Sequence, residues 1–274
     1  MTVITACPQL IALDIDGTLL NSRHEPLPST IEAVAAARGR GTVVALVSGR
    51  DPHMLRILAE RIGLELEGLV LIGRNGSIVM DAVTGETLWS AAFPADLLGR
   101  LVEHLSAFPQ VAASAPAGPR LYSAQPDGHY VRIEAGHNEQ ELHVVPSLAH
   151  VPEPLTKVLM SAPAETIQAL AGQIAAPFHD ELTFAFSAPF YYEATLAGVD
   201  KGTALLRLCQ EAGLDPAATV AFGDQENDLG MLRAAGLGVA MGNAIDSVKE
   251  AADVITDDHD SDGIANLLRD RFAL

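Results

Sequence analysis

The stretch LIALDIDGT (residues 10–18) decides the fold. Its apolar run ends at Asp14, and Asp16, Gly17 and Thr18 follow directly. A short apolar run bounded by turn residues is typical of a strand buried in a parallel sheet. Because Asp14 and Asp16 are separated by one residue, an extended backbone would point both carboxylates to the same side. Gly17 would let the chain turn sharply, and successive amides there can bind an anion.

Two further apolar runs end at polar residues in the same way. TVVALVS closes on Ser48, with Gly49 and Arg50 after it, and ATVAFGD closes on Asp224. In a parallel sheet, the carboxyl ends of such strands converge on one crevice. Lys201 lies in the turn GVDKG and begins a helical segment. Two acidic clusters, a hydroxyl and a lysine at one crevice predict a site for metal-assisted phosphoryl transfer.

Composition limits the class of protein and its partners. The chain has 274 residues, 17 basic and 35 acidic, for a net charge of −18. Such a surface repels nucleic acid and anionic membranes, so neither is expected as a partner. No apolar run approaches the roughly 18 to 20 residues needed to cross a bilayer. Only Cys7 and Cys209 occur, and the N-terminus lacks the basic region of a signal peptide, which together indicate a cytoplasmic protein.

Strand and helix patterns alternate at both ends of the chain. Up to residue 73 the pattern is strand, helix, strand, helix, strand, and the same alternation resumes at residue 201. This predicts an α/β fold with a doubly wound, Rossmann-like parallel sheet. We expect a discontinuous core domain over residues 1–83 and 191–274. Residues 84–190 contain two β-α-β-β-like cycles and predict an inserted α/β cap domain. Since every chemistry-bearing motif lies outside the insertion, a lid over a site is expected.

Two local expectations concern single elements. Ser29 is predicted to be the N-cap of a helix over residues 29–41. Within the insertion, HYVRIEA (residues 129–135) is predicted to be a short strand.

Other sites fit these residues less well. A calcium loop beginning at Asp224 lacks the required glycine and glutamate, and one beginning at Asp258 has Arg269 at its twelfth position. Ser48 lacks the flanking glycines of a serine-nucleophile elbow. The scattered histidines form no zinc pair on a helix, and Lys201 lacks the upstream glycines of an NTPase phosphate loop. Taken singly, the DxDG string could be a solvated turn and Lys201 an exposed lysine at a helix start.

The order of the motifs resembles one family. DxDGT, [ST]-G-R, K-G and GD-x-x-ND occur here in the sequence typical of the haloacid dehalogenase (HAD) superfamily. The insertion after the second motif, flanked by NGS at Asn75, resembles the Cof-type subfamily with its type IIB cap. The segments AMGNA and DGIANLL are also similar to that subfamily. The chain departs from it at Gly73-Arg74, which precedes Asn75 where the family tends to have small or hydroxyl residues.

The resemblance implies a role for each acidic motif residue. Asp14 would be the nucleophile that forms an aspartyl-phosphate. Asp16 would be the general acid to the leaving alcohol and then the base to the hydrolytic water. Mg²⁺ would be bound by the Asp14 carboxylate, the Asp16 backbone carbonyl and Asp224. Asp228 would orient metal-bound water.

The resemblance also implies a phosphate-binding set and an activity. Ser48 and Lys201 would hold phosphoryl oxygens. The remaining phosphate-binding candidates are Thr18, Gly49 and Asn227, and the substrate candidates are Arg50 and Asn75. We expect a Mg²⁺-dependent phosphatase of small phosphorylated metabolites such as sugar phosphates. The alternatives are a phosphomutase or phosphotransferase on the same core, or a non-catalytic regulator that binds small molecules. The sequence does not specify the oligomeric state.

Overall fold

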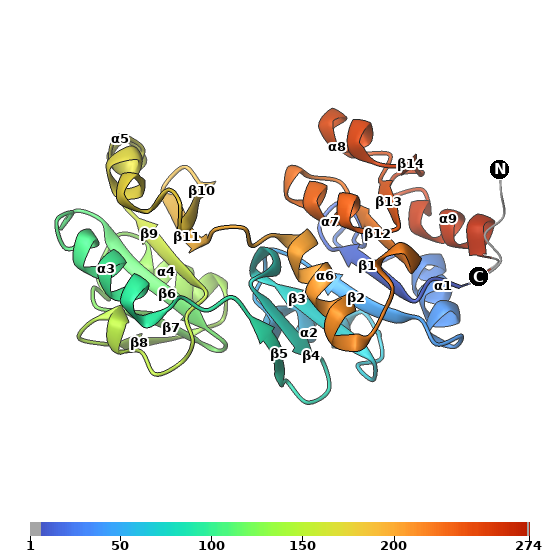
Figure 1. The fold of residues 1–274 in the computed structure, drawn as a ribbon, viewed down its shortest axis with the longest axis horizontal. Coiled ribbons are helices and arrows are strands. Elements are labelled where there is room, and N and C mark those ends of the chain that lie inside the picture. Colours follow the sequence, from blue (N-terminus) through green and yellow to red (C-terminus); the bar gives the residue numbers. More distant parts are fainter. Residues whose placement is uncertain (1–6, 273) are drawn as a thin grey trace. The chain divides into compact units, whose positions relative to one another are not determined.

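The computed structural model describes residues 7–272 and 274, which form two compact units (Figure 1). The first unit comprises the residues up to Trp89 together with Val199–Leu274, and the second comprises Ser90–Gly198. Within the described ranges, no helix is long and apolar enough to cross a membrane.

The described residues of the first unit contain an eight-stranded sheet in the order β14-β13-β12-β1-β2-β3-β4-β5. Neighbouring strands from β14 to β3 are parallel, whereas β4 runs antiparallel to β3. The chain winds outward from β1 in both directions, which confirms the predicted doubly wound α/β fold. The strands are β1 (Leu10–Asp14), β2 (Val43–Val47), β3 (Leu69–Gly73), β4 (Ile78–Asp81), β5 (Thr87–Ser90), β12 (Thr219–Gly223), β13 (Leu237–Ala240) and β14 (Val254–Ile255).

Helices cover both faces of this sheet. Ile11 and Leu13 of β1 pack in one apolar cluster with α1, α2 and α9, whereas Leu10 and Ala12 pack in another with α6, α7 and α8. Because successive strand residues point to opposite faces, a strand covered on both faces must be apolar throughout. This explains the run LIAL. The helices are α1 (Pro28–Arg38), α2 (Pro52–Arg61), α6 (Lys201–Ala212), α7 (Leu229–Ala234), α8 (Asp246–Ala251) and α9 (Gly263–Phe272), with short 3-10 helices η1 (Arg74–Gly76), η4 (Pro216–Ala218) and η5 (Glu226–Asp228).

The second unit is built on a separate sheet in the order β10-β11-β9-β6-β7-β8. Its strand pairs are antiparallel except for β7 and β8, which are parallel. Helices α3 and α5 contribute to its main apolar cluster, and α4 packs in a smaller one. The elements are α3 (Ala95–Leu105), β6 (Ala112–Ala117), β7 (Arg120–Ser123), α4 (Val131–His137), β8 (Glu141–Val144), η2 (Leu148–His150), β9 (Lys157–Ser161), α5 (Ala164–Ala175), η3 (Ala176–Phe178), β10 (Leu182–Ala188) and β11 (Tyr191–Leu196).

The unit boundaries lie later in the chain than the sequence-based ones at residues 84 and 190. The strand β5 lies in the sheet of the first unit, although the sequence assigned it to the insertion. The strand β11 pairs with β10 and β9 of the second unit, although the sequence assigned it to the core. Each of these strands stays in the sheet of the strand that precedes it in the chain, because β5 lies next to β4 and β11 pairs with β10.

Two local expectations are wrong. Residues 131–137 form the helix α4 instead of a strand, because Val131 and Ala135, four residues apart, are buried on one face while Ile133 is 47% exposed. Helix α1 begins at Pro28, and its N-cap residue is Leu27. The hydroxyl of Ser29 instead bonds the carboxylate of Asp262, which ties α1 to the start of α9.

Candidate active site

Three chemistry-bearing residues lie at one edge of the first unit's sheet. Asp14 is the last residue of β1, Ser48 follows β2 and Asp224 follows β12. The strand β1 lies between β2 and β12 and is parallel to both, so the carboxyl ends of the three strands are adjacent. This is the point where the winding direction of the sheet changes, and in such folds ligands bind at that edge.

Lys201 provides the positive charge at this edge. It is the first residue of α6, whose first turn is fixed by a capping box: Asp200 accepts from the Thr203 N–H at 2.7 Å, and the Thr203 hydroxyl accepts from the Asp200 N–H at 2.9 Å. Its Nζ donates to Asp14 Oδ1 and to Asp228 Oδ1, both at 2.6 Å. The side chain is 1% exposed, so the alternative of a solvent-facing lysine is wrong.

Three carboxylates surround this lysine. Asp14, Asp224 and Asp228 are buried, and each has an oxygen within 4.8 Å of the others. Burial raises the pKa of Asp14 to about 7, although Lys201 opposes the shift, and burial also raises the pKa of Asp224. Burial would lower the pKa of Lys201, but the charges of Asp14 and Asp228 outweigh it and raise that pKa. One lysine against three buried carboxylates leaves an excess of negative charge.

Hydrogen bonds give the three carboxylates different surroundings. Asp228 Oδ2 accepts from the backbone N–H groups of Asp224 at 2.9 Å and Gln225 at 3.0 Å, while its Oδ1 accepts from Lys201. Asp224 Oδ1 accepts from the Thr18 hydroxyl at 3.1 Å, and its Oδ2 accepts from Gln225 Nε2 at 3.1 Å. Each oxygen of Asp224 therefore keeps a lone pair, and the donor set consists of oxygens only. Such a set suits a hard cation of the Mg²⁺ class.

The turn after β1 approaches Asp224 closely. Gly17 has φ +79°, and a Cβ at this position would lie 2.4 Å from Asp224 Oδ2. Only glycine allows both the backbone conformation and the contact. The Gly17 carbonyl accepts from Asn243 Nδ2 at 2.8 Å, and Asn243 Oδ1 accepts from the His259 N–H at 3.1 Å. These two hydrogen bonds of Asn243 fix the position of the turn.

The structure separates Asp16 from the three clustered carboxylates. Its oxygens pair with the Arg50 fork, Oδ2 with Nε at 3.1 Å and Oδ1 with Nη2 at 2.7 Å. The Asp16 side chain is 50% exposed, whereas Asp14 is buried. Because β1 ends at Asp14 and the chain then turns, the two-residue period of an extended strand no longer applies at Asp16.

The remaining predicted residues lie beside Ser48. Ser48 is buried, and its Oγ accepts from the Arg50 N–H at 3.2 Å. Gly49 is exposed and adjoins the carboxamide of Asn75. Asn75 Oδ1 in turn accepts from Asn227 Nδ2 at 3.1 Å.

Sequence reasoning missed three residues of this site: Gln225, Asn243 and Asp51. Gln225 contacts both aspartates of the GDQEND motif. Its side chain donates to Asp224 and also takes part in a capping box with Asp228. Asn243 lies in the segment AMGNA, and the similarity of this segment to the subfamily could have indicated that it belongs to the site. Asp51 pairs with the buried Arg74, which belongs to the dipeptide where the chain departs from the family pattern. No motif marked that pair.

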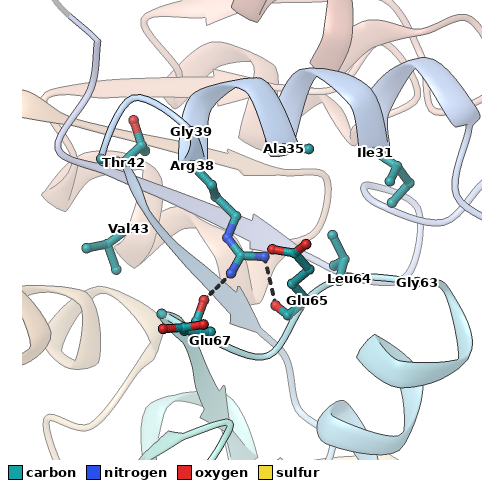
Figure 2. A pocket seen from close by; sticks show the side chains of 12 residues that line it. Ile31, Ala35, Arg38, Gly39, Thr42, Val43, Gly63, Leu64, Glu65 and Glu67 are labelled. Atoms are coloured by element: carbon teal, nitrogen blue, oxygen red, sulfur yellow. Dashed lines mark hydrogen bonds between the residues drawn. The ribbon is translucent and has the colours of Figure 1, made fainter.

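A cavity of about 550 Å³ lies at the opposite end of the same strands (Figure 2). It is lined by residues of α1, the start of β2 and the loop before β3. The Arg38 guanidinium donates to the backbone carbonyl of Glu65 at 2.7 Å and to that of Glu67 (Figure 2). Backbone carbonyls therefore engage one N–H group of each terminal nitrogen of Arg38. None of the residues predicted for phosphate chemistry lines this cavity.

The family follows from comparison with known proteins. A family model described as haloacid dehalogenase-like hydrolase matches residues 11–268. The chain belongs to this family. The pyridoxal phosphate phosphatase YbhA of Escherichia coli (strain K12) is 28% identical over 95% of this chain and 97% of its own. The 5-amino-6-(5-phospho-D-ribitylamino)uracil phosphatase YitU of Bacillus subtilis (strain 168) is 28% identical over 97% of this chain and 98% of its own.

Solved structures of HAD proteins share the fold over nearly the whole chain. A haloacid dehalogenase-like hydrolase from Bacteroides thetaiotaomicron has a TM-score of 0.82 and 28% identity, covering 96% of this chain and 98% of its own. The HAD subclass IIB sugar phosphatase BT4131 has a TM-score of 0.72 and 23% identity, covering 95% and 98%. The predicted HAD membership, with the cap class of subclass IIB, is therefore confirmed.

Proposed function

We propose that this HAD hydrolase is a Mg²⁺-dependent phosphatase of small phosphorylated metabolites that acts through an aspartyl-phosphate on Asp14. The contact that carries the proposal is Lys201 Nζ, held at 2.6 Å from Asp14 and from Asp228 beside Asp224. The names of the two relatives support a small phosphorylated substrate. The net charge of −18 disfavours nucleic acid, and the two cysteines suit a reducing cytoplasm.

The acidic cluster fits a bound Mg²⁺. Asp14, the backbone carbonyl of Asp16 and Asp224 would hold the cation. Asp228 would orient metal-bound water instead of binding the cation directly, because its oxygens already accept from Lys201 and from two backbone N–H groups. Burial and the neighbouring carboxylates raise the pKa values of Asp14 and Asp224, which agrees with a cluster whose negative charge exceeds the single positive charge of Lys201. When bound, the cation stabilises negative charge on the phosphoryl oxygens.

The side chains divide the reaction into two displacements. A carboxylate oxygen of Asp14 attacks phosphorus, the bond from phosphorus to the leaving oxygen breaks, and Asp16 protonates that oxygen. Asp16 then accepts a proton from a water molecule that attacks the phosphoryl group and releases inorganic phosphate and free Asp14. The Arg50 fork keeps the Asp16 carboxylate in a fixed orientation in the resting protein.

Neutral and cationic donors would hold the phosphoryl group during transfer. We assign this role to Lys201, the Ser48 hydroxyl, the Gly49 N–H and Asn227. Thr18 donates its hydroxyl to Asp224, so we assign it to the orientation of that carboxylate.

Phosphate release from a panel of sugar, nucleotide, flavin and pyridoxal phosphates tests the proposal. Mg²⁺-dependent release should vanish with EDTA and in Asp14→Asn, which keeps nearly the same shape. Turnover of a sugar phosphate without release of free phosphate would favour a phosphomutase. Substantial phosphate release by Asp14→Asn would contradict the covalent mechanism.

A further inference from the structure

The segment Arg74–Gly76 between β3 and β4, which carries the label η1, has an unusual backbone with non-helical dihedral angles at Asn75. Its three residues have φ values of +51°, +54° and +99° in succession. Left-handed conformations normally occur as single residues, usually glycine, and arginine is poorly suited to them. Such conformations persist only where the surrounding structure determines them, and they cluster at functional sites. We call Arg74–Gly76 the left-handed loop.

Contacts from the phosphate motifs hold the left-handed loop in place. The Arg74 side chain is 2% exposed and forms an ion pair with Asp51, the N-cap residue of α2. The Arg74 N–H donates to the Arg50 carbonyl at 2.8 Å, and the Asn75 N–H donates to the Ser48 carbonyl at 3.0 Å. The loop is therefore anchored to the segment that contains Ser48 and Gly49.

Gly76 brings the same loop against the start of α6. A Cβ on Gly76 would lie 2.1 Å from the carbonyl oxygen of Asp200 and 3.0 Å from the backbone nitrogen of Lys201. The loop thus contacts the motif around Ser48 on one side and the helix start that carries Lys201 on the other.

The carboxamide of Asn75 lies among groups that we propose for phosphate binding. A Cβ on Gly49 would lie 3.2 Å from Asn75 Oδ1 and 3.4 Å from its Nδ2. Asn75 Oδ1 accepts from Asn227 Nδ2, which leaves the two N–H groups of Asn75 Nδ2 as donors. No acceptor for them is recorded within residues 7–272 and 274, and Asn75 is exposed.

We propose that Asn75 is a substrate-contacting residue whose Nδ2 donates a hydrogen bond to an oxygen of the phosphorylated substrate. The left-handed loop, held by the buried Arg74–Asp51 pair, positions it. This inference rests on the proposed function. The acceptor is an anionic phosphoryl oxygen or an oxygen of the leaving group, and both offer lone pairs to the same donor.

Two substitutions separate substrate contact from architecture. Asn75→Gly keeps the left-handed backbone and removes the carboxamide, whereas Asn75→Asp keeps the shape and replaces the donor with a negative charge. Glu139→Gly is the matched control, because Glu139 is an exposed residue with φ +52° in the second unit. For each protein we would measure the melting temperature, kcat/KM and the inhibition constant of inorganic phosphate.

We expect Asn75→Gly to melt at or above the temperature of the unaltered protein and to lose about 10- to 100-fold in kcat/KM, the range for one hydrogen bond to a charged group. Asn75→Asp should lose more, and Glu139→Gly should keep full activity. A matching rise in the phosphate inhibition constant would identify the phosphoryl group as the acceptor. An unchanged constant beside lowered kcat/KM would identify the leaving group.

Other outcomes would overturn the inference. A kcat/KM for Asn75→Gly within twofold of the unaltered protein would exclude the substrate contact. Lowered activity that accompanies a lowered melting temperature in Asn75→Gly would assign the residue to architecture alone. If the unaltered protein releases no phosphate from any substrate, the proposed function fails, and a contact between Asn75 and a leaving group fails with it. Phosphate binding measured by calorimetry then tests the remaining contact, and equal affinity in both proteins would refute a contact between Asn75 and the phosphoryl group.

Discussion

Replacing Lys201 with methionine should destabilise the protein strongly at alkaline pH. The lysine is 1% exposed and is ion-paired at 2.6 Å with both Asp14 and Asp228, so Lys201→Met leaves three buried carboxylates without a cation. Removing one partner of a buried ion pair costs about 3–5 kcal/mol of unfolding free energy. For a domain of about 150–250 residues this corresponds to a melting temperature lower by roughly 6–20 °C.

The pH dependence of this loss has a definite sign. Burial raises the pKa of Asp14 above its unfolded value of 3.8 to about 7, so its contribution to stability is greatest at low pH and is lost as pH rises through 7. Without Lys201, which lowers this pKa, the ionised form becomes less favourable still. The loss of unfolding free energy in Lys201→Met should therefore be larger at about pH 8 than at about pH 6. Added Mg²⁺ should reduce this loss.

Thermal unfolding with and without Mg²⁺ at both pH values measures this effect. Lys249→Met is the control, because Lys249 lies in the last turn of α8, outside the site. A melting temperature of Lys201→Met within about 2 °C of the unaltered protein at the higher pH, without Mg²⁺, would refute the reasoning.

Three other predictions concern the metal site and the left-handed loop. Mg²⁺ affinity should fall about tenfold per pH unit below pH 7, because the cation must displace a proton from Asp14, and calorimetry that finds no pH dependence would contradict this. Gln225→Met should weaken Mg²⁺ binding by about 10-fold through loss of its bond to Asp224, and an unchanged Kd would oppose that role. Gly76→Ala should cost at least about 1–3 kcal/mol in denaturant unfolding, because its Cβ would lie 2.1 Å from a backbone oxygen. Gly136→Ala, whose Cβ would meet no atom within 4 Å, should not destabilise.

The core fold was predictable because its strands carry a local signal. A strand covered on both faces must be apolar along its whole length, and LIALD and TVVALV are short apolar runs of this kind. The prediction failed for the helix α4, because apolar residues at 131, 133 and 135 alternate as in a strand, whereas only Val131 and Ala135 lie on the buried face of the helix. The unit boundaries follow the pairing of consecutive strands, β4 with β5 and β10 with β11, whereas the sequence-based boundaries at residues 84 and 190 fall between the members of each pair.

The candidate site also has a part that the sequence predicted and a part that it did not. Asp14, Asp224 and Lys201 stood out because each lies at the end or start of a periodic element, and the parallel sheet then brings those ends together. The sequence could not show that Asp16 turns to Arg50 or that Gln225 bonds Asp224, because both contacts depend on side-chain geometry in turns.

The stereochemical course at phosphorus tests the central claim, transfer through Asp14, most directly. Hydrolysis of an isotopically chiral thiophosphate ester in isotopically labelled water reports the number of displacements. Attack by Asp14 followed by attack of water inverts phosphorus twice, so the account predicts net retention of configuration. Net inversion would show a single direct attack by water and would contradict an aspartyl-phosphate on Asp14.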